Sequence, residues 1–276
     1  MLANILATLF LVATARATAI EVQNCTQSEA DNVVRALGLG LQCVDTVLQV
    51  HAGSIAFAGD SNTVLLERYF GTTSPEEFNA ITDVFSHIHD KWNDQPYVCK
   101  GDIIEQVCGP NSGASAFTKV QPNVTGSSVG FQTQLIGFCP SFLDNINFDT
   151  PWPSHVMIHE LAHATVDPPP GDLRLEPLGT CYGEKNSQQL AVWSKELAAR
   201  NADNYAYYAD HLCDAVLGNG VPAAEEDVDW SEQDWYLADE IEKTVLDTSP
   251  ECLHQLVLAG NGLGAAWGQS GSCVRK

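Results

Sequence analysis

The chain has 276 residues, 45% of them hydrophobic, and a net charge of −22 from 13 Lys and Arg against 35 Asp and Glu. This length is enough for a sizeable core in one or two domains. Because so acidic a surface repels phosphate backbones and anionic lipid, we expect neither a nucleic-acid partner nor binding to a membrane surface.

The first nineteen residues have the pattern of a secretory signal peptide. Residues 5–13 (ILATLFLVA) form an apolar run, and Ala17-Thr18-Ala19 fits cleavage before Ile20. The opening MLAN lacks the usual Lys or Arg, and a buried N-terminal helix is the alternative. No other run approaches the roughly 20 apolar residues of a membrane span. We therefore predict a signal peptide over residues 1–19 and a secreted, extracellular protein.

The cysteines agree with an oxidising compartment. All nine follow the predicted cleavage point and none forms a CxxC pair, which argues against a cysteine zinc site. They predict disulfides with one cysteine left over; the positions are Cys25, Cys43, Cys99, Cys108, Cys139, Cys181, Cys213, Cys252 and Cys273. Sequons at Asn24 and Asn123 predict a glycoprotein.

The first half of the chain is predicted to be helical and then irregular. Apolar residues recur at near-helical spacing over 27–50, although Gly38 and Gly40 weaken that prediction. A second helix begins at Pro75, with Ser74 as its cap and Glu77 completing a capping box. Residues 100–128, rich in Gly, Ser, Asn and Pro, predict loops.

The second half is predicted to hold a small sheet followed by helices. Residues 129–138 (VGFQTQLIGF) predict a strand pair or one bent strand. A helix begins at Pro153-Ser154, carries the sequence HELAH and ends before Pro168. Further helices are predicted over 186–200 and 204–217, and two short ones in the tail near 236–247 and 251–259. This order predicts an α+β domain.

The HELAH segment carries the chemistry. His159 and His163 are four residues apart on a helix, so both rings can bind one Zn²⁺. Glu160 can act as a general base on a water molecule whose pKa the metal lowers. The alternative is a buried histidine pair on an amphipathic helix.

The third zinc ligand must come from beyond this helix. His155 lies about 12 Å from His163 along the helix axis, too far to share a metal, and predicts a supporting, capping or cleft-lining residue. A motif extension with glycine and histidine after His163 is absent, because Val166 and Pro169 stand there. Asp172 and Glu184 remain as candidates.

The sequence resembles the deuterolysin or aspzincin family of secreted fungal metalloendopeptidases, which includes the peptidyl-Lys metalloendopeptidases. HELAH, GTCYG (179–183) and NADNYAYYAD (201–210) carry the resemblance, which covers roughly residues 25–215. It implies a zincin-like α+β fold, mainly helical, with a small sheet beside the HExxH helix. It also implies that LIGFCPSF forms the edge strand along which a substrate binds, and that Cys25–Cys99 and Cys108–Cys139 are disulfides.

The resemblance also assigns roles to residues. His159 and His163 match zinc ligands, and Glu160 matches the base. Tyr182 matches a tyrosine that stabilises the transition state, where a phenol could donate to the oxyanion. A packed core tyrosine is the alternative for Tyr182.

The ligand turn departs from the family pattern, Gly-Thr-x-Asp-x-x-Tyr-Gly. The position of the family's aspartate is Gly179 here, and PPPGDLRLEPL expands the loop before it. Asp172 keeps the family's distance from His163 but not from Tyr182. We predict Asp172 as the third ligand; Glu176, Glu184 or no protein ligand are the alternatives, and any of these carboxylates could be a solvated loop charge.

The substrate pocket also departs from the lysine-directed relatives. Asp203 matches one of their two acidic pocket residues, but Ala206 stands at the position of the other. We therefore predict a tolerant pocket containing Asp203; a helix cap is the alternative role for that residue.

Together these observations predict a signal peptide (1–19), a zincin-like metallopeptidase domain (20–215) and a C-terminal extension (216–276) packed on the domain. The predicted function is that of a secreted, monomeric endopeptidase with one Zn²⁺ that hydrolyses peptides or proteins. One alternative is a secreted, non-catalytic zinc-binding protein, zinc-scavenging or antigen-like, because the ligand turn is degenerate. A surface or wall protein with a vestigial site is the other.

Overall fold

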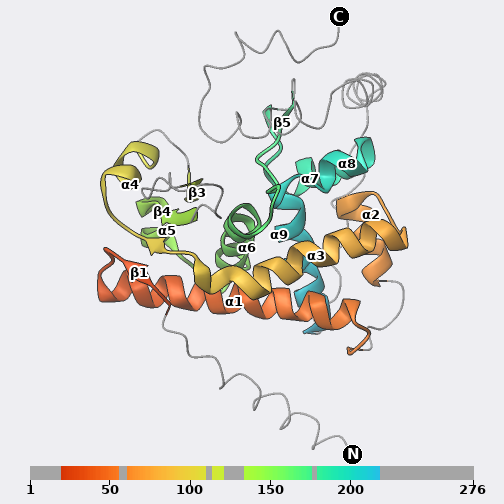
Figure 1. The fold of residues 1–276 in the computed structure, drawn as a ribbon, viewed down its shortest axis with the longest axis horizontal. Helices are drawn as coiled ribbons and strands as arrows, with labels where there is room; N and C mark the ends of the chain where they lie inside the picture. The colour runs from red at the N-terminus through yellow and green to blue at the C-terminus, as the bar shows by residue number, and fades with distance from the viewer. Residues whose placement is uncertain (1–19, 56–60, 110–113, 121–133, 176–178, 218–276) are drawn as a thin grey trace, which may run out of the picture.

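The computed structural model describes residues 20–55, 61–109, 114–120, 134–175 and 179–217. Three predicted parts of the chain therefore lie outside the described residues: the signal peptide, the tail helices and the C-terminal extension. Residues 216 and 217 are the exception, since they begin the predicted extension and are described. Within the described residues the fold is mainly helical with a small four-stranded sheet and a two-stranded ribbon, which confirms the α+β class (Figure 1).

Helix α1 (Gln27–His51) forms the long support of the core. Thr26 and Glu29 close a capping box at its start. Its buried face packs against α6 (Trp152–Thr165) and α9 (Ala202–Val216). A Cβ added at Gly40 would lie 3.1 Å from the Cβ of Met157, so this glycine permits the close approach of α1 to α6. Within the described residues α1 alone has the length and apolar composition of a membrane span, a property that buried core helices share.

Helix α3 (Pro75–Lys91) begins as predicted, with Ser74 as its cap and Pro75 in its first turn. The predicted capping box is wrong, however. The Glu77 carboxylate accepts hydrogen bonds from the side chains of Ser74 and Thr72, while Thr72 Oγ1 accepts from the Ser74 backbone N–H. Lys195 also pairs with Glu77, at 2.6 Å, so this glutamate ties α3 to α8.

Several described elements were not predicted, and three of them are longer than four residues and lie before residue 121. Helix α2 (Ser61–Phe70) follows α1 directly. Helix α4 (Asp102–Val107) and strand β3 (Ala116–Val120) both lie in the segment that composition indicated as loops. That prediction is wrong because the strand's partner, β4, comes later in the chain and supplies hydrogen bonds that local composition does not reveal.

The small sheet has the order β1-β2-β4-β3. Strands β1 (Val22–Gln23), β2 (Tyr97–Val98) and β4 (Gln134–Phe138) run parallel, and β3 pairs antiparallel with β4. The strand LIGF is thus interior, and the expectation that it forms the edge is wrong. The edge beside helix α6 is β3.

Helix α6 (Trp152–Thr165) carries HELAH and is buried over most of its length. It contacts α1, α3 and α9 as well as β3 and β4. The predicted helix over 186–200 is two helices, α7 (Glu184–Trp193) and α8 (Lys195–Ala198), with Ser194 capping the second. Figure 1 shows α6 at the centre, the sheet on one side and α7, α8 and α9 (Ala202–Val216) on the other.

The remaining short elements are the 3-10 turn η1 (Trp92–Asp94) and helix α5 (Pro140–Asn145), together with the ribbon strands β5 (Arg174–Leu175) and β6 (Gly179–Thr180). Disulfides join Cys25 to Cys99 and Cys108 to Cys139, as the resemblance implies. They hold the start of α1 and the end of α4 against the sheet.

Candidate metal centre

Three side chains converge beside α6. The Nε2 atoms of His159 and His163 are 3.1 Å apart, and Asp172 Oδ1 lies 3.0 Å from the first and 3.1 Å from the second. A tetrahedron of zinc ligands with bonds of 2.0–2.1 Å has edges of about 3.3 Å. The three atoms therefore have the mutual spacing that one zinc ion requires.

The far nitrogens of the two rings fix which atoms face the centre. His163 Nδ1 lies 2.6 Å from the carbonyl oxygen of Pro170, which can only accept, so Nδ1 carries the proton. His159 Nδ1 lies 2.6 Å from Asp203 Oδ1, which favours the same tautomer. In the neutral rings both Nε2 atoms then present lone pairs toward the Asp172 carboxylate. Such an arrangement of acceptors needs a cation, and a divalent metal fits it.

The electrostatics of the cluster favour a cation as well. Burial disfavours protonated rings, but Asp203 and Asp172 outweigh burial and raise the pKa of His159 well above 6.5. Burial also opposes ionisation of Asp172, yet the two histidines hold the pKa of its carboxyl well below 3.8. The aspartate is therefore ionised, and the rings take up either protons or a metal.

Glu160 is buried next to these ligands. Burial raises the pKa of its carboxyl, an effect that the neighbouring His159 and His163 oppose. Its Oε2 atom accepts a hydrogen bond of 2.8 Å from Thr118 Oγ1 on strand β3. Thr118 was missed in the sequence because its segment was expected to be a loop; alternation of apolar and polar residues over SAFTKV was the available signal.

Tyr182 lies at the rim of the cluster. Its side chain is 49% exposed, so it is not a packed core tyrosine. The ring centroid is 5.8 Å from that of His159, and the Asp172 carboxylate lies near enough to the hydroxyl to influence its pKa. Burial of the hydroxyl and the nearby carboxylates raise the pKa of Tyr182, so the phenol keeps its proton and remains a donor.

Glu184, the other described candidate for the third ligand, does not join this group. Glu184, on α7, accepts hydrogen bonds from Tyr69 Oη at 2.8 Å and from Gln188 Nε2 at 2.9 Å. Glu176 lies outside the described residues. Of the two candidates that the structure describes, Asp172 is the one whose carboxylate meets both imidazoles.

Comparison with known proteins agrees with this geometry. Residues 55–210 match the aspzincin family, described as lysine-specific metallo-endopeptidase. The chain belongs to this family. A zinc peptidase from Grifola frondosa is a solved structure with 18% sequence identity and a TM-score of 0.48, over 68% of this chain and 97% of that one. No curated protein matches the chain.

The expanded loop of this aspzincin folds as a ribbon. Strands β5 and β6 pair antiparallel, and Cys181 N donates to Leu173 O at 2.7 Å at the base of the ribbon. Gly171 N donates to Arg200 O at 2.6 Å, and Gly171 O accepts from the N–H of Ala202, the first residue of α9, at 3.1 Å. The ribbon thus begins beside Asp172 and returns the chain beside Tyr182.

Asp203 lies behind the metal centre in the first turn of α9. It is 5% exposed and accepts from His159 Nδ1, from Gly183 N at 2.8 Å and, at a longer 3.4 Å, from His155 Nε2. Asn201, not Asp203, occupies the N-cap position of α9. The Asp203 carboxylate is therefore turned toward a candidate ligand of this aspzincin.

His155 supports Asp203 from one turn earlier on α6. Its Nδ1 lies 3.1 Å from Asp210 Oδ2, and Ser154 Oγ donates to the other oxygen of Asp210 at 2.9 Å. Burial lowers the pKa of His155, but the two aspartates outweigh burial and raise it to about 9. His155, His159 and Asp203 form a second group of side chains that could hold a metal ion. The 2.6 Å contact between His159 and Asp203, however, is that of a hydrogen bond.

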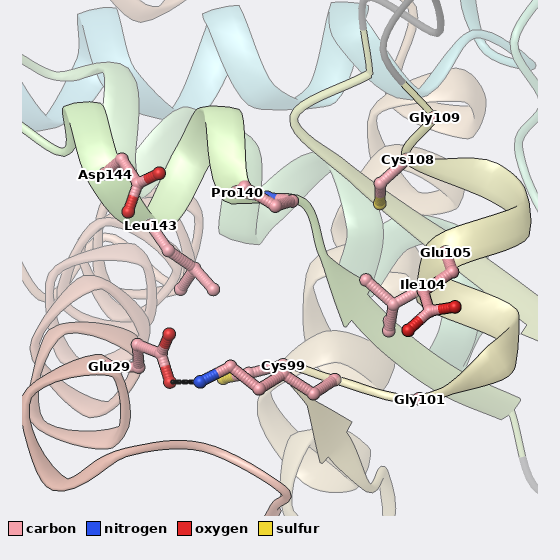
Figure 2. Close-up of a pocket in the computed structure, with 11 residues that line it drawn as sticks. Glu29, Cys99, Gly101, Ile104, Glu105, Cys108, Gly109, Pro140, Leu143 and Asp144 are labelled. Atoms are coloured by element: carbon pink, nitrogen blue, oxygen red, sulfur yellow. Dashed lines mark hydrogen bonds and ion pairs between the residues drawn. The ribbon is translucent and has the colours of Figure 1, made fainter.

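A separate cavity of about 330 Å³ lies between the start of α1 and helices α4 and α5 (Figure 2). Glu29 and Lys100 form an ion pair of 3.0 Å at this cavity. None of the converging residues at α6 lines it. The cavity is therefore not part of the candidate metal centre.

Proposed function

We propose that this aspzincin is a secreted zinc-dependent endopeptidase whose metal is held by His159, His163 and Asp172. The observation that carries the proposal is the convergence of their three ligand atoms within 3.1 Å, with Glu160 beside them. Family membership supports a metallopeptidase activity. The two disulfides and the apolar segment at residues 5–13 support secretion.

A zinc ion bound there would act as a Lewis acid toward water and the scissile carbonyl. Glu160 is proposed to accept the proton of the attacking water and to pass it to the leaving amine. Its burial raises the pKa of the carboxyl, which makes the carboxylate a stronger base for the first of these steps. Tyr182 is proposed to donate its hydroxyl proton in a hydrogen bond to the oxyanion. Asp203 holds the ring of His159 through Nδ1.

The substrate is proposed to be an extended peptide or protein segment bound along β3. Strand β3 stands at the end of the sheet order and pairs with β4 on one side. A peptide added to its other side would bind through backbone hydrogen bonds, which need no particular side chain. Contact of β3 with α6 would bring that peptide next to Glu160.

The test measures zinc content and casein hydrolysis for the secreted protein and two variants. We expect one zinc per chain and hydrolysis in the wild type, zinc without hydrolysis in Glu160→Gln, and loss of both in His163→Ala. General-base removal typically costs 10²–10⁴-fold in rate. A wild type that binds zinc but cleaves nothing would favour the non-catalytic zinc-binding alternative. Undiminished zinc in His163→Ala would overturn the site itself.

A further inference from the structure

Thr118 lies where the edge of the sheet meets the helix that carries the motif. It is the central residue of β3 and stands opposite Ile136 of β4 in the antiparallel register. Its side chain is half-buried and turns toward α6. Thr118 Oγ1 lies 2.8 Å from Glu160 Oε2 and 3.0 Å from the backbone oxygen of the same residue.

The Thr118 hydroxyl has one proton and two acceptors within reach. A helix-interior carbonyl such as that of Glu160 normally accepts from the backbone N–H four residues later, so it does not depend on the hydroxyl. A buried carboxylate without a donor pays a desolvation penalty. The proton therefore stabilises the structure most when it points to Oε2, and the second contact limits how far the hydroxyl can turn away.

We propose that Thr118 is a positioning residue for Glu160. Holding Oε2 against the sheet fixes the rotamer of this side chain and would leave Oε1 as the oxygen that takes the proton of the attacking water. The inference deepens the proposed function and depends on it, because a positioned base matters only if the site hydrolyses peptides. It also assigns β3 a second role besides binding substrate. The strand would position Glu160, the base that acts on the peptide bound along the same strand.

The test compares two substitutions that differ in the hydroxyl. Thr118→Val keeps the branched shape and removes the donor, whereas Thr118→Ser keeps the donor. Thr165→Val is a matched control, because Thr165 is a buried threonine on α6 whose hydroxyl, within the described residues, donates to the Leu161 carbonyl at 2.7 Å. Each zinc-loaded protein is assayed for kcat, KM, zinc affinity and melting temperature.

We expect Thr118→Val to lower kcat by about 10- to 100-fold, the range for losing a hydrogen bond to a charged group, with KM and zinc affinity near wild type. Thr118→Ser should recover most of kcat, and Thr165→Val should leave it unchanged. In a Glu160→Gln background Thr118→Val should cause no further loss. An infrared difference spectrum of the metal-free protein should show the Glu160 carboxylate band shifted in Thr118→Val but not in Thr118→Ser.

Three outcomes overturn the inference. Thr118→Val with wild-type kcat, in an active protein, shows that the hydroxyl does not matter to Glu160. A loss of zinc affinity or melting temperature that matches the loss of kcat assigns Thr118 a structural role. A wild type that hydrolyses nothing overturns the proposed function and this inference together, which the first two outcomes do not.

Discussion

Asp203 provides the sharpest test of how the candidate ligands are held. Its carboxylate accepts from His159 Nδ1 at 2.6 Å and from Gly183 N at 2.8 Å. The substitution Asp203→Asn keeps the shape but removes the charge and replaces one acceptor oxygen with an NH₂ group. That group would face an N–H of His159 or Gly183, since both partners donate. His159 should then lose its fixed tautomer and ring orientation.

The size of the effect follows from these contacts. A hydrogen bond to a charged group is worth about 1.5–3 kcal/mol. Removing an outer carboxylate from a metal-binding histidine typically costs 10- to 100-fold in affinity, which corresponds to about 1.4–2.7 kcal/mol. Because the Nδ1–Oδ1 contact is short and buried, we expect a loss toward the upper end of that range.

Competition for zinc against a chromogenic chelator measures this loss directly. Asp210→Asn is the matched control, because Asp210 is also a buried carboxylate on α9 but contacts His155 and Ser154 rather than a candidate ligand. We expect Asp203→Asn to bind zinc up to about 100-fold more weakly, near the upper end of that range, and Asp210→Asn to stay within about threefold of wild type. A folded Asp203→Asn protein with wild-type zinc affinity and a raised KM for basic peptides would refute this reasoning and assign Asp203 to the substrate.

Three further predictions follow. The pKa of His155 is raised to about 9 in the folded state, so its contribution to stability is full below about pH 6.5 and is lost as the pH rises through 9. Melting of the metal-free protein between pH 7 and 9.5 should show this loss, which amounts to up to about 3 kcal/mol. The variant His155→Gln should not show it. Cys43 and Cys213 are buried thiols, so iodoacetamide should modify them only after unfolding, which mass spectrometry of native and denatured samples would check. Cleavage should not be confined to bonds before lysine, because the buried Asp203 already accepts from His159 and Gly183 and the buried Ala206 offers no carboxylate. Sequencing of cleavage sites in a mixed peptide library would contradict this if every site preceded lysine.

Local signals predicted the parts of this fold that local interactions determine. The start of α3 follows from Ser74 and Pro75, which satisfy and pre-order the first turn without help from the rest of the chain. The facing of His159 and His163 follows from helical geometry alone. The helices over 27–51, 152–165 and 202–216 lie close to their predicted ranges for the same reason.

Pairing between distant segments was not predictable in the same way. Strand β3 owes its hydrogen bonds to β4, and residues 121–133 separate the two in sequence. Thr118 consequently looked like one polar residue among many in a loop-like segment, and its contact with Glu160 depends on how the sheet edge docks against α6. The expectation that LIGF forms the edge of the sheet failed for the same reason, because the sequence of a single strand does not reveal that strands pair with both of its sides.

The proposed ligand turn shows what the number of residues between two positions indicates about their distance in space, and what it does not. Asp172 is nine residues after His163 in the sequence. Because α6 is a rigid helix that ends at Thr165, this number of residues limits how far the aspartate can lie from the histidine. Tyr182 is ten residues after Asp172 instead of the three in the family pattern, yet its ring lies 5.8 Å from that of His159 and its hydroxyl is near that aspartate. Strands β5 and β6 explain this, because an antiparallel ribbon returns its second end beside its first whatever its length. The insertion therefore moves the tyrosine along the sequence but not away from the candidate metal centre, and the glycine at position 179 is a residue of strand β6.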